Sequence, residues 1–354
     1  MKLMFVSDAW FPQVNGVVTT MSTVIETLRN EGHEVDVIQP SQFYTVPMPT
    51  YPEIRLSMDV WRVGEKIARF KPDRLHIVTE GPLGLAAMRY MSRRGMSYTT
   101  AFHTKFPEYT NARFPFVTVP FGYRVMHAFH KHSERVMVAT DSVRKELEHW
   151  GFDNVVTWSR GVDTSVFRPL DADDENPLAH LDGKVAIYVG RIAPEKNIQA
   201  FLDVDYEGHK VVVGDGPSRA KLEAQYPHVH FVGYQKGRDL ARYFAAADVF
   251  VFPSLTDTYG VVMLEAMACG TPVAAFPVSG PLDVVNDGVT GVLDEDLSRA
   301  MTRAERLSSD DCIAQARSNN WEKTAQFLLR NMVPANWSQQ VQKVASAEGA
   351  QPSV

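Results

Sequence analysis

The side chains best suited to chemistry lie in one stretch, residues 253–273, which reads PSLTDTYGVVMLEAMACGTPV. The pattern predicts a strand over 248–252, a loop that carries Asp257, and a helix that begins at Gly260 and holds Glu265 in its second turn. A carboxylate accepts two hydroxyl hydrogen bonds at once, which suits the vicinal diols of sugars. A helix N-terminus favours negative charge, so this stretch can hold sugar, phosphate and sugar in line.

A second candidate site follows an expected strand over 184–189. Gly190, Arg191 and Lys196 lie on one loop and helix start, at the sheet edge where ligands of open α/β sheets bind. Two cations five residues apart can grip a diphosphate, and each contact contributes up to about 4 kcal/mol of gross Coulomb energy at about 4 Å. The alternative is a solvated arginine and lysine that pair with Glu195.

Three further features have both a functional and a structural interpretation. Gly16, after the first expected strand, would let backbone amides approach a phosphate, or would only make the turn. His103 stands alone at a strand end, where a structural role is equally consistent. Gly214 and Gly216 suggest a dinucleotide loop, but the third glycine of that pattern would fall at Arg219, which favours a tight turn.

These residues need sheets to position them, and the hydrophobic pattern predicts two. Apolar β-rich runs alternate with amphipathic helical stretches, which is typical of βα units around parallel sheets. The polar stretch Pro169–Gly183 is the predicted linker, and the fold class is α/β with two doubly wound domains in tandem. The expected strands cover 2–7, 34–39, 74–78, 97–102, 136–139, 155–157, 184–189, 210–213, 229–232, 248–252, 272–276 and 291–293. The expected helices cover 17–31, 59–70, 82–94, 141–150, 195–203, 217–225, 237–246, 260–269, 280–286, 295–307 and about 310–330.

Composition is that of globular domains and excludes several classes of protein. The 354 residues, 45% hydrophobic and 22% charged, allow two to three domains. Cys269 and Cys312 lack metal-type spacing, so neither a disulfide framework nor a zinc site is supported, and a reduced cytoplasmic location is expected. No window holds 18 consecutive apolar residues, so no bilayer span is expected, and the apolar run before Asp8 is too short for a signal peptide. The net charge of −6 argues against a nucleic-acid partner.

The charge is unevenly spread along the chain. Residues 89–145 hold ten basic and three acidic side chains, interleaved with aromatic residues. Near an anionic leaflet each basic residue contributes about 1 kcal/mol, so this segment predicts binding to an anionic membrane surface. The alternative is that its aromatic side chains are core or line a buried pocket. The residues assigned to this contact surface are Arg113, Phe114, Phe116, Phe121, Tyr123, Arg124 and Lys131.

Seven motifs, in order, resemble the retaining glycosyltransferases of the GT-B fold, family four. They are the Asn-Gly-Val loop, FHT at 102–104, GVDTSVF at 161–167, Gly190-Arg191 with Lys196, the Gly-Asp-Gly-Pro turn, FVGY at 231–234, and Asp257 to Glu265, where Asp257 replaces the family's usual glutamate. The resemblance implies two Rossmann-like domains facing a cleft: an N-terminal acceptor domain, 1–167, and a C-terminal nucleotide-sugar domain, 168–320. It also implies a helix over 321–345 that packs back on the N-terminal domain. A frayed tail is expected over 346–354.

The same resemblance implies roles for individual residues. Arg191 and Lys196 would neutralise the leaving diphosphate, Glu265 would hold the ribose, and Asp257 would bind the transferred sugar. The implied catalytic residues are His103, Arg191, Lys196 and Asp257, and the implied donor-binding residues are Gly16, Gly190, Arg191, Lys196, Gly233, Tyr234, Asp257, Gly260, Val261, Val262 and Glu265.

The implied reaction moves a hexose from a nucleoside-diphosphate sugar with retention at the anomeric carbon, and needs no metal or other cofactor. Asp-x-Asp triplets at 171–173, 203–205 and 294–296 would suit a metal-dependent transferase, but their expected positions indicate solvated acid. A nucleotide-sugar epimerase of the same fold and a catalytically silent nucleotide-sugar binder are competing functions for the same motifs.

The opening, residues 7–17, resembles bacterial family members that glycosylate lipids. A UDP-glucose-type donor and a diacylglycerol-type lipid acceptor are therefore expected, with peripheral association at the inner face of the cell membrane. Soluble saccharides and sugar phosphates are the competing acceptors.

Overall fold

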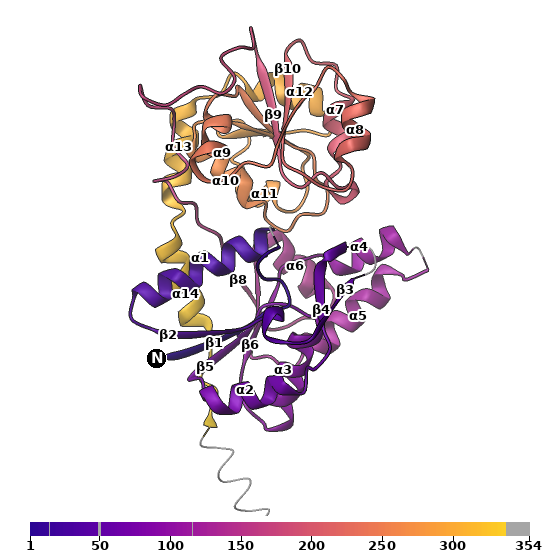
Figure 1. Cartoon of the computed structure of the whole chain (residues 1–354), viewed down its shortest axis with the longest axis vertical. Coiled ribbons are helices and arrows are strands. Elements are labelled where there is room, and N and C mark those ends of the chain that lie inside the picture. The colour runs from indigo at the N-terminus through magenta and orange to yellow at the C-terminus, as the bar shows by residue number, and fades with distance from the viewer. Residues whose placement is uncertain (14, 49–50, 115, 338–354) are drawn as a thin grey trace, which may run out of the picture. The chain divides into compact units, whose positions relative to one another are not determined.

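The computed structural model of the chain describes residues 1–13, 15–48, 51–114 and 116–337. The chain divides into two compact units (Figure 1). Unit 1 holds Met1–Ser159 and the residues from Thr324 onward, and unit 2 holds Arg160–Lys323. The predicted tail, 346–354, and the last part of the predicted final helix, 338–345, lie outside the described residues.

Unit 1 is built on a parallel six-stranded sheet in the order β2-β1-β5-β6-β7-β8 (Figure 1). Leu3–Val6 of the first strand are fully buried, as expected for a parallel strand covered on both faces. The strands are β1 (Lys2–Val6), β2 (Glu34–Ile38), β5 (Arg74–Ile77), β6 (Thr99–Phe102), β7 (Arg135–Val138) and β8 (Val155–Thr157), and β3 (Thr45–Met48) pairs with β4 (Tyr51–Ser57) in a separate antiparallel hairpin. The helices are α1 (Gly16–Asn30), α2 (Arg62–Phe70), α3 (Pro82–Arg93), α4 (Phe106–Arg113), α5 (Val119–His130) and α6 (Asp141–His149), with a short 3-10 turn, η1 (Pro40–Gln42).

Unit 2 repeats the plan with a parallel sheet in the order β11-β10-β9-β12-β13-β14. All five residues of its central strand β9 are buried. The strands are β9 (Val185–Val189), β10 (His209–Val213), β11 (His230–Gly233), β12 (Val249–Phe252), β13 (Val273–Ala275) and β14 (Gly291–Leu293). The helices are α7 (Ile198–Leu202), α8 (Arg219–Gln225), α9 (Gly237–Ala245), α10 (Val261–Ala268), α11 (Pro281–Val284), α12 (Leu297–Ala304) and α13 (Ser309–Ser318), with a 3-10 turn, η2 (Pro194–Lys196). Helix α14 (Trp321–Asn331) begins in unit 2 and continues into unit 1.

The chain enters unit 2 at Arg160, eight residues before the predicted boundary at 167/168. Residues 160–167 belong to unit 2 because Phe167 packs on Phe244 of α9 and Val162 donates a backbone hydrogen bond to Asn319. The predicted linker, Pro169–Gly183, is not a free connection either, since Asp174 forms an ion pair with Arg238 of α9.

Residues 324–337 pack on the rest of unit 1. Trp158 Nε1 donates to the Thr324 carbonyl at 2.9 Å, and Arg74 Nη1 donates to the carbonyls of Leu329 and Met332 at the end of α14. Trp337 Nε1 donates to the Pro72 carbonyl at 2.7 Å. Among the described residues, no helix has both the length and the apolar character needed to cross a bilayer.

Candidate active site

The carboxyl ends of β9 and β12 bring the two predicted donor motifs of unit 2 together. The strands pair directly, with Ile187 opposite Phe250, so the loops that follow them are neighbours. Lys196 Nζ donates to Asp257 Oδ1 at 2.6 Å, and Asn197 Nδ2 reaches the Pro253 carbonyl at 3.0 Å. The two motifs, 61 residues apart in the chain, therefore meet through an ion pair.

The second carboxylate oxygen of Asp257, Oδ2, is the atom of this pair that can accept a hydrogen bond from a ligand. Oδ2 is buried and accepts no hydrogen bond from any described residue, whereas Oδ1 is held by Lys196. A buried carboxylate oxygen without a donor is costly, and a sugar hydroxyl could satisfy it. The Lys196 side chain is 26% exposed, and its ammonium can exchange the carboxylate for a more strongly charged diphosphate.

Gly260 opens α10 in a backbone conformation that only glycine adopts easily. Its φ is +77°, and a Cβ there would lie 2.8 Å from the Phe252 ring and 2.9 Å from the Met263 methyl carbon. The turn directs the chain into α10, whose first amides belong to Val261 and Val262. Because the first amides of a helix have no partner within it, this N-terminus is suited to a phosphate oxygen.

Glu265 lies one turn into α10, as predicted. Burial raises the pKa of its carboxyl from 4.5 to about 7. A carboxylate in such a place gains from any hydroxyl donors that a ligand supplies, because they replace the water that it has lost.

The glycines after β9 and β10 serve close backbone packing. A Cβ at Gly214 would lie 1.9 Å from the Gly190 carbonyl oxygen, and one at Gly216 would lie 2.4 Å from the Ile192 carbonyl oxygen. These contacts support the tight turn that was the structural interpretation of this motif. Arg191 follows Gly190 in a partly buried position, and its carbonyl accepts from the Tyr188 hydroxyl at 2.8 Å.

Gly233 ends β11 with a φ of +81°, and its carbonyl accepts from the Gly214 amide at 2.8 Å. Tyr234 follows with 53% of its surface exposed. The position of Tyr234 is therefore set by the backbone hydrogen bond at Gly233 and not by packing of the tyrosine ring.

In unit 1, the predicted phosphate loop at Gly16 is partly used by the protein itself. The Asn15 side chain accepts hydrogen bonds from the amides of Val17 and Val18 at 3.1 and 3.0 Å. A phosphate at this helix start would compete with Asn15 for those amides. A Cβ at Gly16 would meet no atom within 4 Å, so the structure itself does not require glycine there.

His103 follows β6 and is 9% exposed, with its ring packed edge-on against Trp158 at a centroid distance of 6.1 Å. An anionic residue that the predicted motifs do not include lies at the same edge of the sheet. Asp8, directly after β1 and Ser7, accepts from the amides of Leu83 and Gly84 at the start of α3, and burial raises its pKa. Its signal in the sequence is a lone aspartate at the end of an apolar strand.

Comparisons with known proteins identify the family. A family model described as "Glycosyl transferases group 1" matches residues 183–310, and one described as "Glycosyltransferase Family 4" matches residues 14–166. The GDP-mannose-dependent alpha-mannosyltransferase of Mycolicibacterium smegmatis is 30% identical over 320 residues, which cover 83% of this chain and 84% of that protein. The chain belongs to the family 4 glycosyltransferases.

Two further matches extend this result for the glycosyltransferase. The alpha-monoglucosyldiacylglycerol synthase of Acholeplasma laidlawii is 26% identical over 318 residues, which cover 77% of this chain and 79% of that protein. The crystal structure of Anabaena HepE in complex with UDP and glucose has a TM-score of 0.70 at 17% identity and covers 93% of this chain and 98% of that one. The two Rossmann-like sheets are thus those of the GT-B fold, as predicted.

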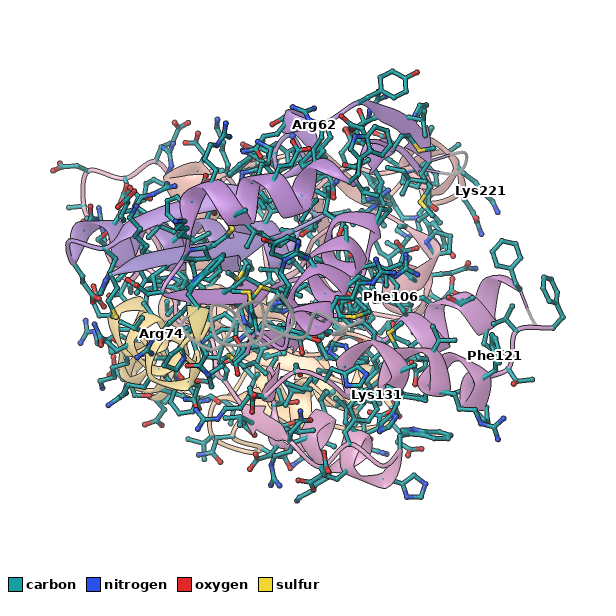
Figure 2. All side chains as sticks on the ribbon, turned by 90° about the horizontal axis from the view of Figure 1, so that it is seen from below. Arg62, Arg74, Phe106, Phe121, Lys131 and Lys221 are labelled. Atoms are coloured by element: carbon teal, nitrogen blue, oxygen red, sulfur yellow. The ribbon has the colours of Figure 1, made fainter. Side chains whose placement is uncertain are left out.

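Helices α4 and α5 of the glycosyltransferase carry the predicted membrane or acceptor segment. Figure 2 shows Phe106, Phe121 and Lys131 on this part of unit 1. We define the α4–α5 surface by five large hydrophobic side chains that are exposed among the described residues. Their exposed fractions run from 42% to 81%, and they are Phe106, Phe114, Phe116, Phe121 and Val125.

Other predicted members of that segment behave differently. Arg124 and Lys131 are exposed, whereas the side chain of Arg113 lies outside what the structure describes. Tyr123 is only 1% exposed, so it cannot belong to an exposed surface. Its ring stacks on Trp150 at 4.5 Å, and its hydroxyl lies 2.7 Å from a Glu108 oxygen and 2.9 Å from a Glu146 oxygen.

The three Asp-x-Asp triplets of the glycosyltransferase are used in contacts within unit 2. In the first, Asp171 forms an ion pair with Arg168. In the second, Asp203 accepts from the Tyr226 hydroxyl. In the third, Asp294 forms ion pairs with Arg299 and Arg303. Each triplet therefore has a structural role, which the interpretation as solvated acid describes only in part.

Proposed function

We propose that this glycosyltransferase moves a hexose from a nucleoside-diphosphate sugar to a diacylglycerol-type membrane lipid, with retention at the anomeric carbon. The transfer is supported by the ion pair of Lys196 and Asp257 beside the N-terminus of α10. The lipid acceptor rests on the α4–α5 surface, because an exposed apolar area of this kind marks a site of protein or membrane interaction.

In the proposed reaction, the bond between the anomeric carbon and the diphosphate oxygen breaks as an acceptor hydroxyl oxygen attacks from the same side. The hydroxyl proton passes to the leaving phosphate. Lys196, Arg191 and the first amides of α10 stabilise the negative charge that grows there. Asp257 Oδ2 accepts a hydroxyl of the sugar, and Glu265 accepts the hydroxyls of the ribose. Gly233 and Tyr234 border the nucleotide base, as the resemblance to the family implies.

The resemblance also implies roles for Gly16 and His103 in this reaction. In the proposed reaction His103 positions the donor sugar and is not an obligatory base. No metal or other cofactor takes part in this proposal, since cations of the protein and the helix dipole supply the positive charge.

The matched relatives support the proposal to different extents. The name of the Acholeplasma laidlawii relative states a glucosyl product on diacylglycerol, which agrees with a UDP-glucose-type donor and a lipid acceptor. The name of the Mycolicibacterium smegmatis relative states GDP-mannose, and its identity to this chain is higher. A GDP-mannose-dependent mannosyltransferase is therefore the second candidate.

The decisive experiment offers the purified enzyme UDP-glucose and GDP-mannose in separate reactions with diacylglycerol in anionic vesicles. Mass spectrometry of the organic phase should show a diacylglycerol carrying one added hexose, and the productive donor chooses between the two candidates. A matched reaction with soluble saccharides should give no product. Sugar found only in water-soluble products, with no binding to the vesicles in flotation at low salt, would refute the lipid acceptor. Peripheral association with the inner face of the cell membrane would follow from the expected result.

A further inference from the structure

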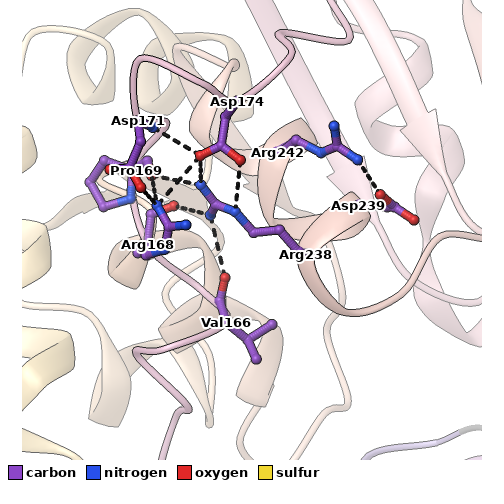
Figure 3. Close-up of polar contacts among 8 residues, drawn as sticks. All are labelled: Val166, Arg168, Pro169, Asp171, Asp174, Arg238, Asp239 and Arg242. Carbon is purple, nitrogen blue, oxygen red and sulfur yellow. Dashed lines mark hydrogen bonds and ion pairs between the residues drawn. The ribbon is translucent and has the colours of Figure 1, made fainter.

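The segment that follows the entry into unit 2 is fastened to α9 by one side chain. Figure 3 shows Arg238, the second residue of α9, among residues 166–174. Its guanidinium binds both oxygens of the Asp174 carboxylate, with Nε donating to Oδ1 at 3.3 Å and Nη2 to Oδ2. The guanidinium in turn keeps the pKa of Asp174 low, at about 2.

The remaining donors of Arg238 bind three backbone carbonyls of the same segment. Nη1 donates to Arg168 at 2.8 Å and more weakly to Val166 at 3.4 Å, and Nη2 donates to Pro169 at 2.9 Å. A guanidinium has five N–H groups, so all of them are used here. A lysine has three donors on a single nitrogen and cannot reproduce this arrangement.

An apolar contact adds to this connection. Phe167 lies in the same segment and packs edge-on against Phe244 of α9 at a centroid distance of 6.4 Å. The Phe167 amide also donates to the Asp163 carbonyl at 2.9 Å, which closes a turn just before the arginine contacts. Residues 163–174 therefore form one ordered structure with α9.

The first turn of α9 matters because the loop before it carries Tyr234. The loop is only three residues long, 234–236, and α9 begins at Gly237. The residue before this loop, Gly233, is held by the hydrogen bond that its carbonyl accepts from the Gly214 amide. Because the Tyr234 ring is 53% exposed, these two ties determine where it is presented.

We propose that Arg238 is a positioning residue of the donor site, which holds Tyr234 in place for the nucleotide base by fastening the start of α9 to residues 166–174. The inference rests on the proposed function, in which Tyr234 borders the base. Stacking of a base on an aromatic ring contributes to nucleotide affinity, so a displaced ring should weaken nucleotide binding measurably.

The test compares Arg238→Lys with Arg242→Lys, a matched control one turn further along α9. Arg242 forms an ion pair with Asp239, and Figure 3 draws no hydrogen bond from it to residues 166–174. Calorimetric titration measures the Kd of UDP, of GDP and of pyrophosphate, which has no base. For Arg238→Lys we expect about a tenfold higher Kd for the tighter-binding nucleotide, equal to about 1.4 kcal/mol, and a pyrophosphate Kd within about twofold of the native value. Arg242→Lys should match the native enzyme on both probes.

Asp174→Asn is the second variant, and it decides the question if Arg238→Lys does not fold. It should raise the nucleotide Kd in the same direction and leave the pyrophosphate Kd unchanged. Equal losses for nucleotide and pyrophosphate would overturn the inference, because they would indicate a general disturbance of unit 2. Unchanged nucleotide binding would overturn it as well.

Tyr234→Ala separates this inference from the proposed function. If Tyr234→Ala weakens nucleotide binding while Arg238→Lys and Asp174→Asn do not, the positioning role is wrong and the donor site stands. If Tyr234→Ala binds UDP and GDP as the native enzyme does, the assignment of Tyr234 to the base is wrong and the role of Arg238 is refuted with it.

Discussion

At the scale of single residues, Lys196 is held by the carboxylate that is proposed to bind the sugar. Lys196→Ala should lower kcat by at least about 100-fold, because a lost charge-stabilising group costs about 3 kcal/mol in the transition state. Arg191→Ala should have a similar effect. Steady-state kinetics with the productive donor measures both.

Lys221 provides the matched control for these two variants. It is an exposed lysine of α8 in the same unit, so Lys221→Ala removes a positive charge without touching the site. Its kcat should stay within about twofold of the native value. Rates for Lys196→Ala and Arg191→Ala that equal those of the control would contradict the assignment of both cations to the donor site.

The carboxyl of Glu265 predicts a pH dependence of stability. Its pKa is about 7 in the folded chain against an ordinary value of 4.5, so the folded state binds the proton more tightly. The protonated form stabilises the fold below about pH 4.5, and that contribution is lost as the pH rises through about 7. Glu265→Gln should therefore be more stable than the native enzyme at about pH 8 by up to about 3 kcal/mol, and nearly equal to it at about pH 4.5.

Denaturant unfolding of the ligand-free protein at intervals between about pH 5 and about pH 8 measures this difference. Glu207→Gln, at an exposed position of unit 2, is the control and should show no such trend. If the Glu265→Gln and native stabilities stay parallel over this range, the pKa of Glu265 is not raised in the folded chain.

At the scale of elements, the residue pattern predicted the strands that carry the donor site but not the contacts between their loops. Asp257 and Lys196 were expected at the same sheet edge because β9 and β12 both end there. Their ion pair depends on β9 and β12 being neighbours, a fact of strand order that spacing along the chain does not contain.

Helices α4 and α5 show a different reason for a missed prediction. Each has a proline, Pro107 or Pro120, in its first turn. Proline is tolerated there because its missing amide hydrogen would have no partner in the helix, yet in the sequence it indicates a break. The exposed aromatic residues nearby also obscure the helical period, so no helix or strand was expected between 103 and 135.

Helix α5 also shows why Tyr123 and Phe121 were both assigned to the exposed segment, although only Phe121 is exposed. The two residues are two positions apart on α5, so they point in different directions from the helix axis. Phe121 is 56% exposed, whereas Tyr123 is buried against Trp150. Aromatic composition alone predicts neither direction.

At the scale of the whole molecule, two separate cores were predictable because each series of strands is apolar enough to be buried on both faces. The point where the chain enters unit 2 was not predictable from the sequence, because residues 160–167 show no hydrophobic periodicity. They belong to unit 2 through Phe167 and the donors of Arg238, and those contacts require the folded positions of α9.

The chain returns to unit 1 at Thr324, and the hydrogen bonds that Arg74 makes with the end of α14 give a prediction about the stability of that region. Arg74 donates to the carbonyls of Leu329 and Met332, which a helix end leaves without partners of its own. Arg74→Ala removes both hydrogen bonds and should cost unit 1 about 2 kcal/mol.

Hydrogen exchange read by mass spectrometry measures this effect locally. In Arg74→Ala, amides of 324–331 should exchange faster, whereas those of β9 in unit 2 should keep their native rates, because the two cores are separate. Arg69→Ala, at an exposed position of α2, is the control and should leave both regions unchanged. Faster exchange in β9 to the same extent as in 324–331 would mean that the two units unfold together, since a local loss at one helix end cannot reach a separate core.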